Sequence, residues 1–173
     1  MAQKELERRP TLPFFLLTDT QDLTLAANHN ELTLPTGFIR EYEEGGVYRL
    51  GDEEEESWEK LGKLTHNQAI RHSGSGTPSC YAILGNTLSV YPTPTTEETI
   101  RLVHYASATA LDTNVSNGWL QHAPELLILL TEARCKPGAA EFARQEAERQ
   151  WMLLADETFR RRFEQQSLVI EVN

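Results

Sequence analysis

The residues of this chain that could do chemistry are few and scattered. Of its five histidines, only His66 and His72 come close together in the sequence. Their spacing of six residues fits no common pair of zinc ligands, so solvated helix side chains are the favoured interpretation. Cys80 and Cys135 lie 55 residues apart with no CxxC or Cys/His pattern, and we expect two free thiols in the core.

No motif of a phosphate-binding loop, a zinc protease or a serine hydrolase occurs in the sequence. Gly74-x-Gly76 is too short for a dinucleotide-binding fingerprint, and a plain linker is the better interpretation. No nucleophile, base and orienting group appear together. We therefore predict a protein that is not an enzyme, with no catalytic residues, no metal site and no cofactor.

Two runs of charge are the strongest local features. The residues Asp52, Glu53, Glu54, Glu55 and Glu56 point their carboxylates in different directions, so a solvated loop is preferred over a cation site. The opposite run, Arg160, Arg161 and Arg162, closes a long predicted helix. It either complements the helix dipole or contacts an acidic partner or a phosphate backbone, and both interpretations stay open.

Composition limits the class of protein. With 173 residues, 39% hydrophobic residues and 24% charged residues, the chain is typical of one globular domain. The net charge of −10 argues against tight, counterion-releasing contacts with nucleic acid. The start of the chain has no apolar signal region and the longest apolar run, Leu126–Leu130, is too short to span a membrane. We expect a soluble, intracellular protein without a membrane partner.

The residues before about 110 predict β-structure. Alternation predicts a hairpin of 23–25 with 32–34, a second pair of 38–42 with 47–50, and a strand over 58–64. Thr65 is a candidate N-cap for a short helix over 66–72. Gly85-Asn86 joins 80–84 to 87–91 as a two-residue hairpin, and 99–106 is a further strand.

The residues after about 114 predict helices. Ser116 or Asn117 caps a short turn that carries Trp119, and Pro124 begins a helix that ends at Cys135. That helix is apolar nearly all round, so we expect it to be buried on most sides. One long helix is predicted over 139–163, with a stripe made of Ala140, Ala143, Ala147, Trp151, Leu154 and Thr158. The end of the chain, 168–172, has strand propensity.

The order of several segments carries a resemblance. Leu34-Pro35-Thr36-Gly37-Phe38 comes first, followed by Pro78 and a hairpin with the pattern Y-A-I-L-G-N-T-L-S-V-Y-P-T-P over 81–94. Val103-His104-Tyr105 ends the next strand, and Asn117-Gly118-Trp119-Leu120 and Ala123-Pro124-Glu125-Leu126-Leu127 open the helices. Over roughly residues 5 to 165, this order resembles the head-to-tail adaptor (connector) proteins of tailed bacteriophages. His104-Tyr105 stands where the family has an aromatic pair, Glu125 where it has Asp, and the N-terminal helical segment is shorter.

The resemblance implies an α+β fold, with a C-terminal helical hairpin or bundle and an inserted β-rich domain of antiparallel hairpins. The segments that it implies are 1–15 as an N-terminal helical part of the bundle, 16–110 as the insertion with its short helix near 65–72, 111–165 as the bundle, and 166–173 as a C-terminal tail.

The resemblance also implies a structural role in the virion. Such adaptors form a ring, typically of twelve copies, at the neck between head and tail, and are assembled in the cytoplasm of the bacterial host. The implied partners are the portal protein, a tail or nozzle/stopper protein, and further copies of the chain itself. DNA passes through the channel during ejection without specific binding, which agrees with a net charge that repels phosphates.

Candidate contact residues follow from this role. A closed ring needs two different complementary patches, which the acidic run 52–56 and the basic run 160–162 could supply. Adaptors of this kind commonly insert a C-terminal tail into the portal, and Leu168, Val169, Ile170, Glu171 and Val172 suit strand addition to a partner sheet. The alternative is a frayed chain end.

Three other functions stay open at this stage. The nearest is a stopper or tail-completion protein at the same junction, although stoppers are usually dominated by β-structure. The second is a small cytoplasmic enzyme or ligand-binding protein with its pocket in the β-rich section. The third is a free regulatory protein.

Overall fold

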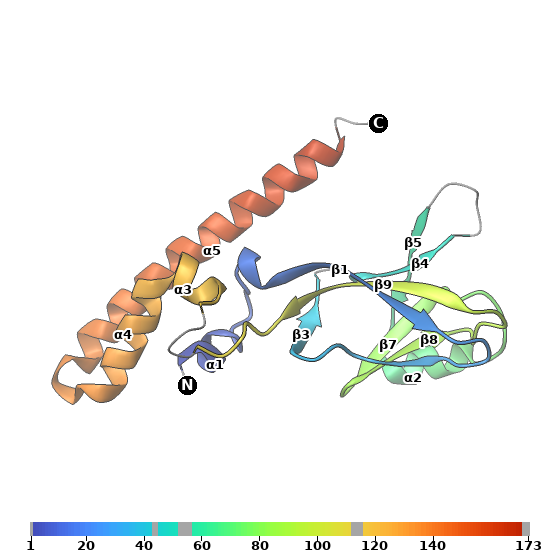
Figure 1. Ribbon diagram of the computed structural model, residues 1–173, viewed down its shortest axis with the longest axis horizontal. Helices are drawn as coiled ribbons and strands as arrows, with labels where there is room; N and C mark the ends of the chain where they lie inside the picture. Colours follow the sequence, from blue (N-terminus) through green and yellow to red (C-terminus); the bar gives the residue numbers. More distant parts are fainter. Residues whose placement is uncertain (1, 43–44, 52–56, 112–115, 171–173) are drawn as a thin grey trace. The chain divides into compact units, whose positions relative to one another are not determined.

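The structure is a computed structural model that describes residues 2–42, 45–51, 57–111 and 116–170, without the side chains of 18, 19, 139 and 162–170. It contains helices and antiparallel sheets, which confirms the α+β class. The chain divides into two compact units (Figure 1). The helical unit comprises Met1–Leu16 and Ser107–Asn173, and the β unit comprises Leu17–Ala106.

The first sheet of the β unit is built around one long strand. β9 (Glu98–Ala106) pairs antiparallel with β1 (Leu17–Leu25) on one side. On its other side β9 pairs with β3 (Phe38–Glu41) and β4 (Val47–Leu50), and β4 also pairs with β5 (Trp58–Lys60). β9 is therefore the centre of the sheet.

The second sheet of the β unit has the strand order β2-β8-β7-β6. Its strands are β2 (Glu31–Thr33), β6 (Gly62–Lys63), β7 (Cys80–Leu84) and β8 (Thr87–Tyr91). The predicted hairpin of β7 with β8 is confirmed, because Leu84 pairs with Thr87 across a two-residue turn. Gly85 has a φ of 60°, a conformation in which the lack of a Cβ is an advantage.

Two predicted hairpins are wrong. The segments 23–25 and 32–34 belong to different sheets, because β1 pairs with β9 whereas β2 pairs with β8. The turn between them exists, with Asn28 at a φ of 62°, but it carries the chain from one sheet to the other. Likewise β3 and β4 both pair with β9 and not with each other.

Gly46 is required where the chain joins β9. Its carbonyl accepts a hydrogen bond from the Val103 N–H at 2.7 Å. A Cβ at this position would lie 2.2 Å from the Val103 carbonyl oxygen, closer than any side chain tolerates. The glycine thus allows β4 to approach the central strand.

The predicted strand over 58–64 is divided between the two sheets. β5 pairs with β4, and β6 pairs in parallel with β7. Leu61 stands between β5 and β6 with only 3% of its surface exposed. Its burial in the core between the sheets explains the change of partner.

The core of the β unit holds the two sheets together. Its buried residues come from both sheets and from the loops that join them: Leu25, Leu34, Val47, Leu61, Tyr81, Leu88, Val90, Ile100 and Leu102. The β unit also contains α2 (His66–Ala69) and the 3-10 turn η2 (Ile70–His72), where one helix over 66–72 was predicted. The Thr65 N–H donates to Gln68 Oε1 at 3.1 Å, as expected for a capping box.

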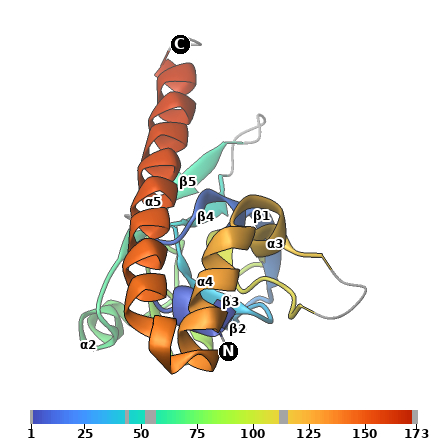
Figure 2. The same cartoon turned by 90° about the vertical axis from the view of Figure 1, so that its left-hand side faces the viewer.

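The helical unit begins with α1 (Ala2–Leu6) and η1 (Phe14–Leu16), and its other elements follow the β unit in the chain. These are α3 (Gly118–His122), α4 (Pro124–Cys135), η3 (Pro137–Ala139) and α5 (Ala140–Ile170). α4 has the predicted bounds, with Pro124 in the first turn. α5 ends at Ile170 and not at 163. Figures 1 and 2 both draw α4 alongside the first half of α5.

None of the helices within the described ranges is long and apolar enough to cross a membrane.

Candidate interaction site in the helical unit

The N-terminal segment is fixed to the rest of the helical unit by a buried carboxylate. Glu7 is 8% exposed and accepts hydrogen bonds from Ser107 Oγ at 2.7 Å and from the Ala108 N–H and Trp119 Nε1, each at 3.2 Å. Gln3 Nε2 also donates to it, at 2.9 Å. Because a buried carboxylate is costly without partners, these donors determine where the N-terminal segment can lie.

Asn117 extends this network and begins α3. Its Oδ1 accepts from the Leu120 N–H at 3.1 Å, so Asn117, of the two candidates, is the N-cap. Its Nδ2 donates to the Thr109 carbonyl at 2.6 Å and to Gln3 Oε1 at 3.1 Å. The Asn117 side chain thereby caps α3 and connects it to Gln3 and Thr109, which belong to the two chain segments of the helical unit.

Aromatic rings form the centre of the helical unit. Trp119 packs edge-on to Phe15 at 5.0 Å between ring centroids and lies 6.5 Å from Trp151. Phe15 in turn stacks on His122 at 5.1 Å. The prediction that Trp119 and Trp151 pack in the core is confirmed, since both are buried.

Two arginines cover the ends of this aromatic cluster. The Arg9 guanidinium lies 4.7 Å from the centroid of Trp151 and forms an ion pair with Glu148. Its hydrogen bond holds the pKa of the Glu148 carboxyl below the usual range. Arg161 lies 3.9 Å from the centroid of Phe14. Cation–π contacts therefore connect the N-terminal segment to α5 at two points.

α4 and α5 pack closely because α5 presents small residues. Ala143 and Ala147 are completely or almost completely buried, and Leu154 and Thr158 continue the same face. α4 contributes Leu126, Leu130 and Ala133 as buried residues. The stripe expected from helical spacing is thus the packed face of α5.

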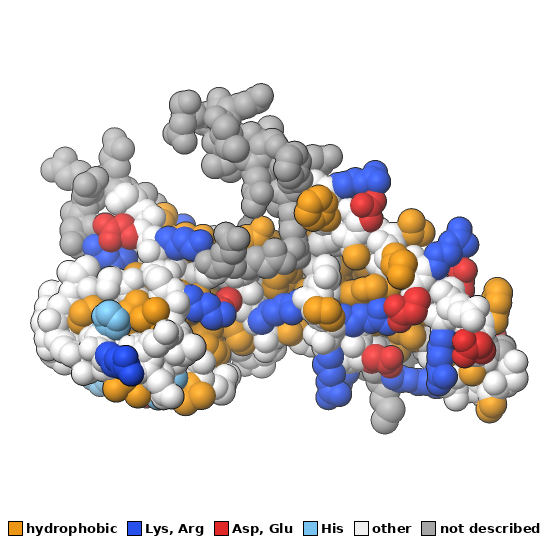
Figure 3. Space-filling model, turned by 180° about the vertical axis from the view of Figure 1, so that it is seen from behind, with side chains coloured by type: hydrophobic (Ala, Val, Ile, Leu, Met, Phe, Trp, Pro, Cys, Tyr) orange, Lys and Arg blue, Asp and Glu red, His pale blue; other side chains and the backbone are white. Residues whose placement is uncertain are grey.

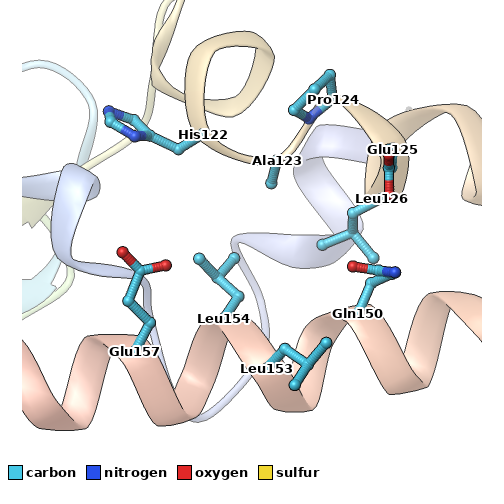
Figure 4. Close-up of a pocket in the computed structure, with 9 residues that line it drawn as sticks. All are labelled: His122, Ala123, Pro124, Glu125, Leu126, Gln150, Leu153, Leu154 and Glu157. Carbon is cyan, nitrogen blue, oxygen red and sulfur yellow. The ribbon is translucent and has the colours of Figure 1, made fainter.

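A notch of about 260 Å³ opens where α4 begins against α5. Figure 4 shows Leu126 and Leu154 pointing toward each other in its middle, with Glu157 and His122 at one end. Gln150 and Glu125 lie toward the other end. The notch combines an apolar floor with hydrogen-bonding groups at both ends and holds no nucleophile, so it is suited to binding a partner's side chain.

The prediction that α4 is buried on most sides is wrong. Ile128 is 63% exposed, although α5, α3 and α1 all contact α4. Cys135 is also exposed and not a core thiol, whereas Cys80 is buried as predicted. Figure 3 shows hydrophobic side chains at the surface of the helical unit, on the right, among acidic and basic ones.

The basic run lies within α5 and not at its end. Arg160 contacts Asp156 at 2.7 Å and Arg161 contacts Glu157 at 2.7 Å, each one turn earlier in the helix. The helix continues to Ile170, so the interpretation of this run as a complement to the helix dipole is wrong. The side chain of Arg162 lies outside the described part.

The other predicted contact residues are only partly described. The acidic run Asp52–Glu56 lies outside the described residues, so the pairing of the two charged runs stays a prediction. Leu168, Val169 and Ile170 are in the last turn of α5, where an extended strand was expected. Glu171 and Val172 lie outside the described residues.

Within the described ranges, no three His, Cys, Asp or Glu residues gather as a metal-binding group.

Comparison with known families shows the family of this chain. The model of the family described as "SU10 adaptor protein" matches residues 1–169. The chain belongs to the SU10 adaptor protein family. No curated protein matches the sequence.

Membership of the SU10 adaptor family sets the general function. The family is structural and not enzymatic, and its members are bacteriophage proteins of the virion. The general partners of this SU10 adaptor are therefore proteins of the phage head–tail junction.

Sequence reasoning missed two features of this adaptor. Glu7 follows the short charged helix α1, and the only hint of its burial was that a buried tryptophan usually needs a partner for its indole N–H. The exposed apolar residues of α4 were missed because an all-apolar helix gives no sign of which side lacks a partner.

Proposed function

We propose that this chain is the head-to-tail adaptor of a tailed bacteriophage. Copies form a ring, of about twelve as in similar adaptors, that binds beneath the portal, extends the DNA channel and offers the surface on which the tail docks. The observation that carries the proposal is the family match over residues 1–169, which spans both the helical unit and the β unit. A helical hairpin of α4 and α5 is, on this proposal, the framework of each subunit.

The charge of the chain supports a DNA channel. A net charge of −10 disfavours tight contacts with phosphates, which would slow a moving genome. DNA passes through the ring and is not held by it.

The C-terminal residues Leu168, Val169, Ile170, Glu171 and Val172 are proposed to dock on the portal. Four of these five residues are apolar, and the first three are the last residues of the 31-residue helix α5. Burial of such side chains against a partner supplies the favourable free energy of binding.

The proposal is tested by removing the protein from the phage. A phage with an early stop codon in this gene should accumulate DNA-filled heads and separate tails, and addition of the purified protein should join them. Tailed, infectious particles made without the protein would contradict the proposal. Unjoined heads that already carry a ring of another protein under the portal would assign this chain to a stopper position instead.

A further inference from the structure

The side of α4 that faces away from α5 is apolar and hollowed. Ile128 is 63% exposed and Leu120 is 47% exposed. With Pro124 and Cys135 they line a groove of about 440 Å³, which we call the α4 groove. Exposed apolar side chains gathered in this way indicate a surface for another protein.

The side of α5 that faces away from α4 is apolar and protrudes. Phe142, Met152 and Phe159 are between 67% and 72% exposed, and we call them the α5 ridge. Met152 is two residues from the buried Leu154, which places it about 200° away around the helix. The α4 groove and the α5 ridge therefore lie on opposite sides of the α4–α5 pair.

Charged side chains that could pair across a contact stand beside both surfaces. On α4, Glu125 and Glu132 stand three residues before and four residues after Ile128. On α5, Arg149 stands three residues before Met152 and Arg160 follows Phe159 directly, and 73% of each arginine side chain is exposed. Arg149 pairs with Glu146 and Arg160 pairs with Asp156, each about one turn away on α5. Glu132 pairs in the same way with Lys136, one turn further along the chain. Such exposed pairs are weak and can exchange partners.

We propose that the α4 groove of one subunit receives the α5 ridge of the next. Both surfaces are apolar with charged borders, and both belong to the same compact unit of every copy. A contact between two different surfaces is heterologous, so its repetition excludes a closed dimer and builds a ring where the rotation between copies closes. The inference rests on the proposed function and assigns the subunit contact of that ring to α4 and α5.

The native cysteine of the groove provides the test. Cys135 is exposed in the groove and Cys80 is buried. Met152→Cys or Phe142→Cys adds one thiol to the ridge, so each copy then carries one reactive group on each surface. Treatment of the full-length protein with a short bis-maleimide should link copies into a ladder of dimers, trimers and larger chains on a denaturing gel.

Two matched control variants test whether the cross-linked ladder reports the proposed contact. Cys135→Ser combined with Met152→Cys leaves one reactive thiol per copy and should give no product larger than a dimer. Arg144→Cys places the second thiol on α5 at an exposed position outside the ridge, and should give no ladder.

The outcomes separate this contact from the proposed function. Absence of trimers and larger products from both ridge variants, or an equal ladder from Arg144→Cys, overturns the assigned contact. A ladder with no copies of the chain in virion necks would instead overturn the proposed function alone. Necks that contain the chain, together with failed ladders, would leave the proposed function standing and remove the assigned contact.

Discussion

Glu7 is the residue on which the position of the N-terminal segment depends. Its substitution by alanine leaves the indole N–H of Trp119, the Ser107 hydroxyl and the Ala108 N–H without their acceptor. We expect Glu7→Ala to lower the free energy of unfolding of the helical unit by about 2–4 kcal/mol. Urea titration followed by tryptophan fluorescence measures this loss.

Glu5→Ala is the matched control for Glu7→Ala. Glu5 is in α1, two residues before Glu7, and forms an exposed ion pair with Arg134, which contributes less than about 1 kcal/mol. Equal effects of the two substitutions would contradict the role given to Glu7.

We expect His104 to make the β unit sensitive to acid. It is 1% exposed and stacks on Phe38 at 5.6 Å, and burial lowers its pKa. Because the unfolded chain binds the proton more readily, stability is lost as the pH falls below about 6.5 and through the lower pKa of the folded state.

His104→Phe keeps an aromatic ring in place and removes the titrating group. Between about pH 7.5 and pH 5, the melting temperature of the wild type should fall more than that of the variant. The same fall in both proteins would show that other groups cause the acid sensitivity.

At the scale of single residues, the sequence allowed the special helix positions to be predicted better than the buried polar ones. Pro124 and Asn117 act locally. A proline ring fixes the backbone of its own residue, and an N-cap side chain accepts a hydrogen bond from a backbone N–H in the first turn. Glu7 acts through Ser107, Ala108 and Trp119, which are about a hundred residues away in the chain. No local pattern indicates such a contact.

At the scale of elements, the close approach of α4 and α5 depends on small side chains. Ala147 is fully buried in the packed face of α5. Ala147→Leu adds three carbon atoms there and should destabilise the helical unit by about 1–3 kcal/mol through overpacking. The exposed Gln145→Leu on the same helix is the control and should change the free energy of unfolding by less than about 0.5 kcal/mol. Chemical denaturation measures both, and a neutral Ala147→Leu would refute tight packing at this point.

Helices of this chain were predicted more reliably than strand partners. The bounds of α4 follow from local residues. The pairing of β9 with β1, β3 and β4 depends instead on the burial of residues such as Leu25 and Ile100 between two sheets. The turn at Asn28 has the composition of a hairpin turn and yet connects the two sheets. The end of α5 was placed too early because three arginines were interpreted as a helix terminus.

The candidate site also depends on contacts that the local sequence does not indicate. The basic run was expected to close the long helix, whereas Arg160 and Arg161 lie within α5 and form ion pairs with Asp156 and Glu157. The apolar face of α4 was recognised as apolar, and only its neighbours in the fold show that Ile128 remains exposed.

At the scale of the whole molecule, the end of the chain is expected to contribute to assembly and not to folding. Deletion of residues 168–173 removes four apolar residues from the last part of the chain. The truncated protein should unfold at the same denaturant concentration as the full chain and bind purified portal rings at least tenfold more weakly, as measured by interferometry. Unchanged portal binding would exclude these residues as the docking segment.

The account as a whole rests on the place of this chain in the particle. The most direct measurement is electron cryo-microscopy of the neck of intact virions, with the two units of this chain fitted to the density. The account predicts a ring of copies directly beneath the portal, with the helical units side by side and the DNA channel running through the ring. A neck whose density at that position is accounted for by other proteins would contradict it.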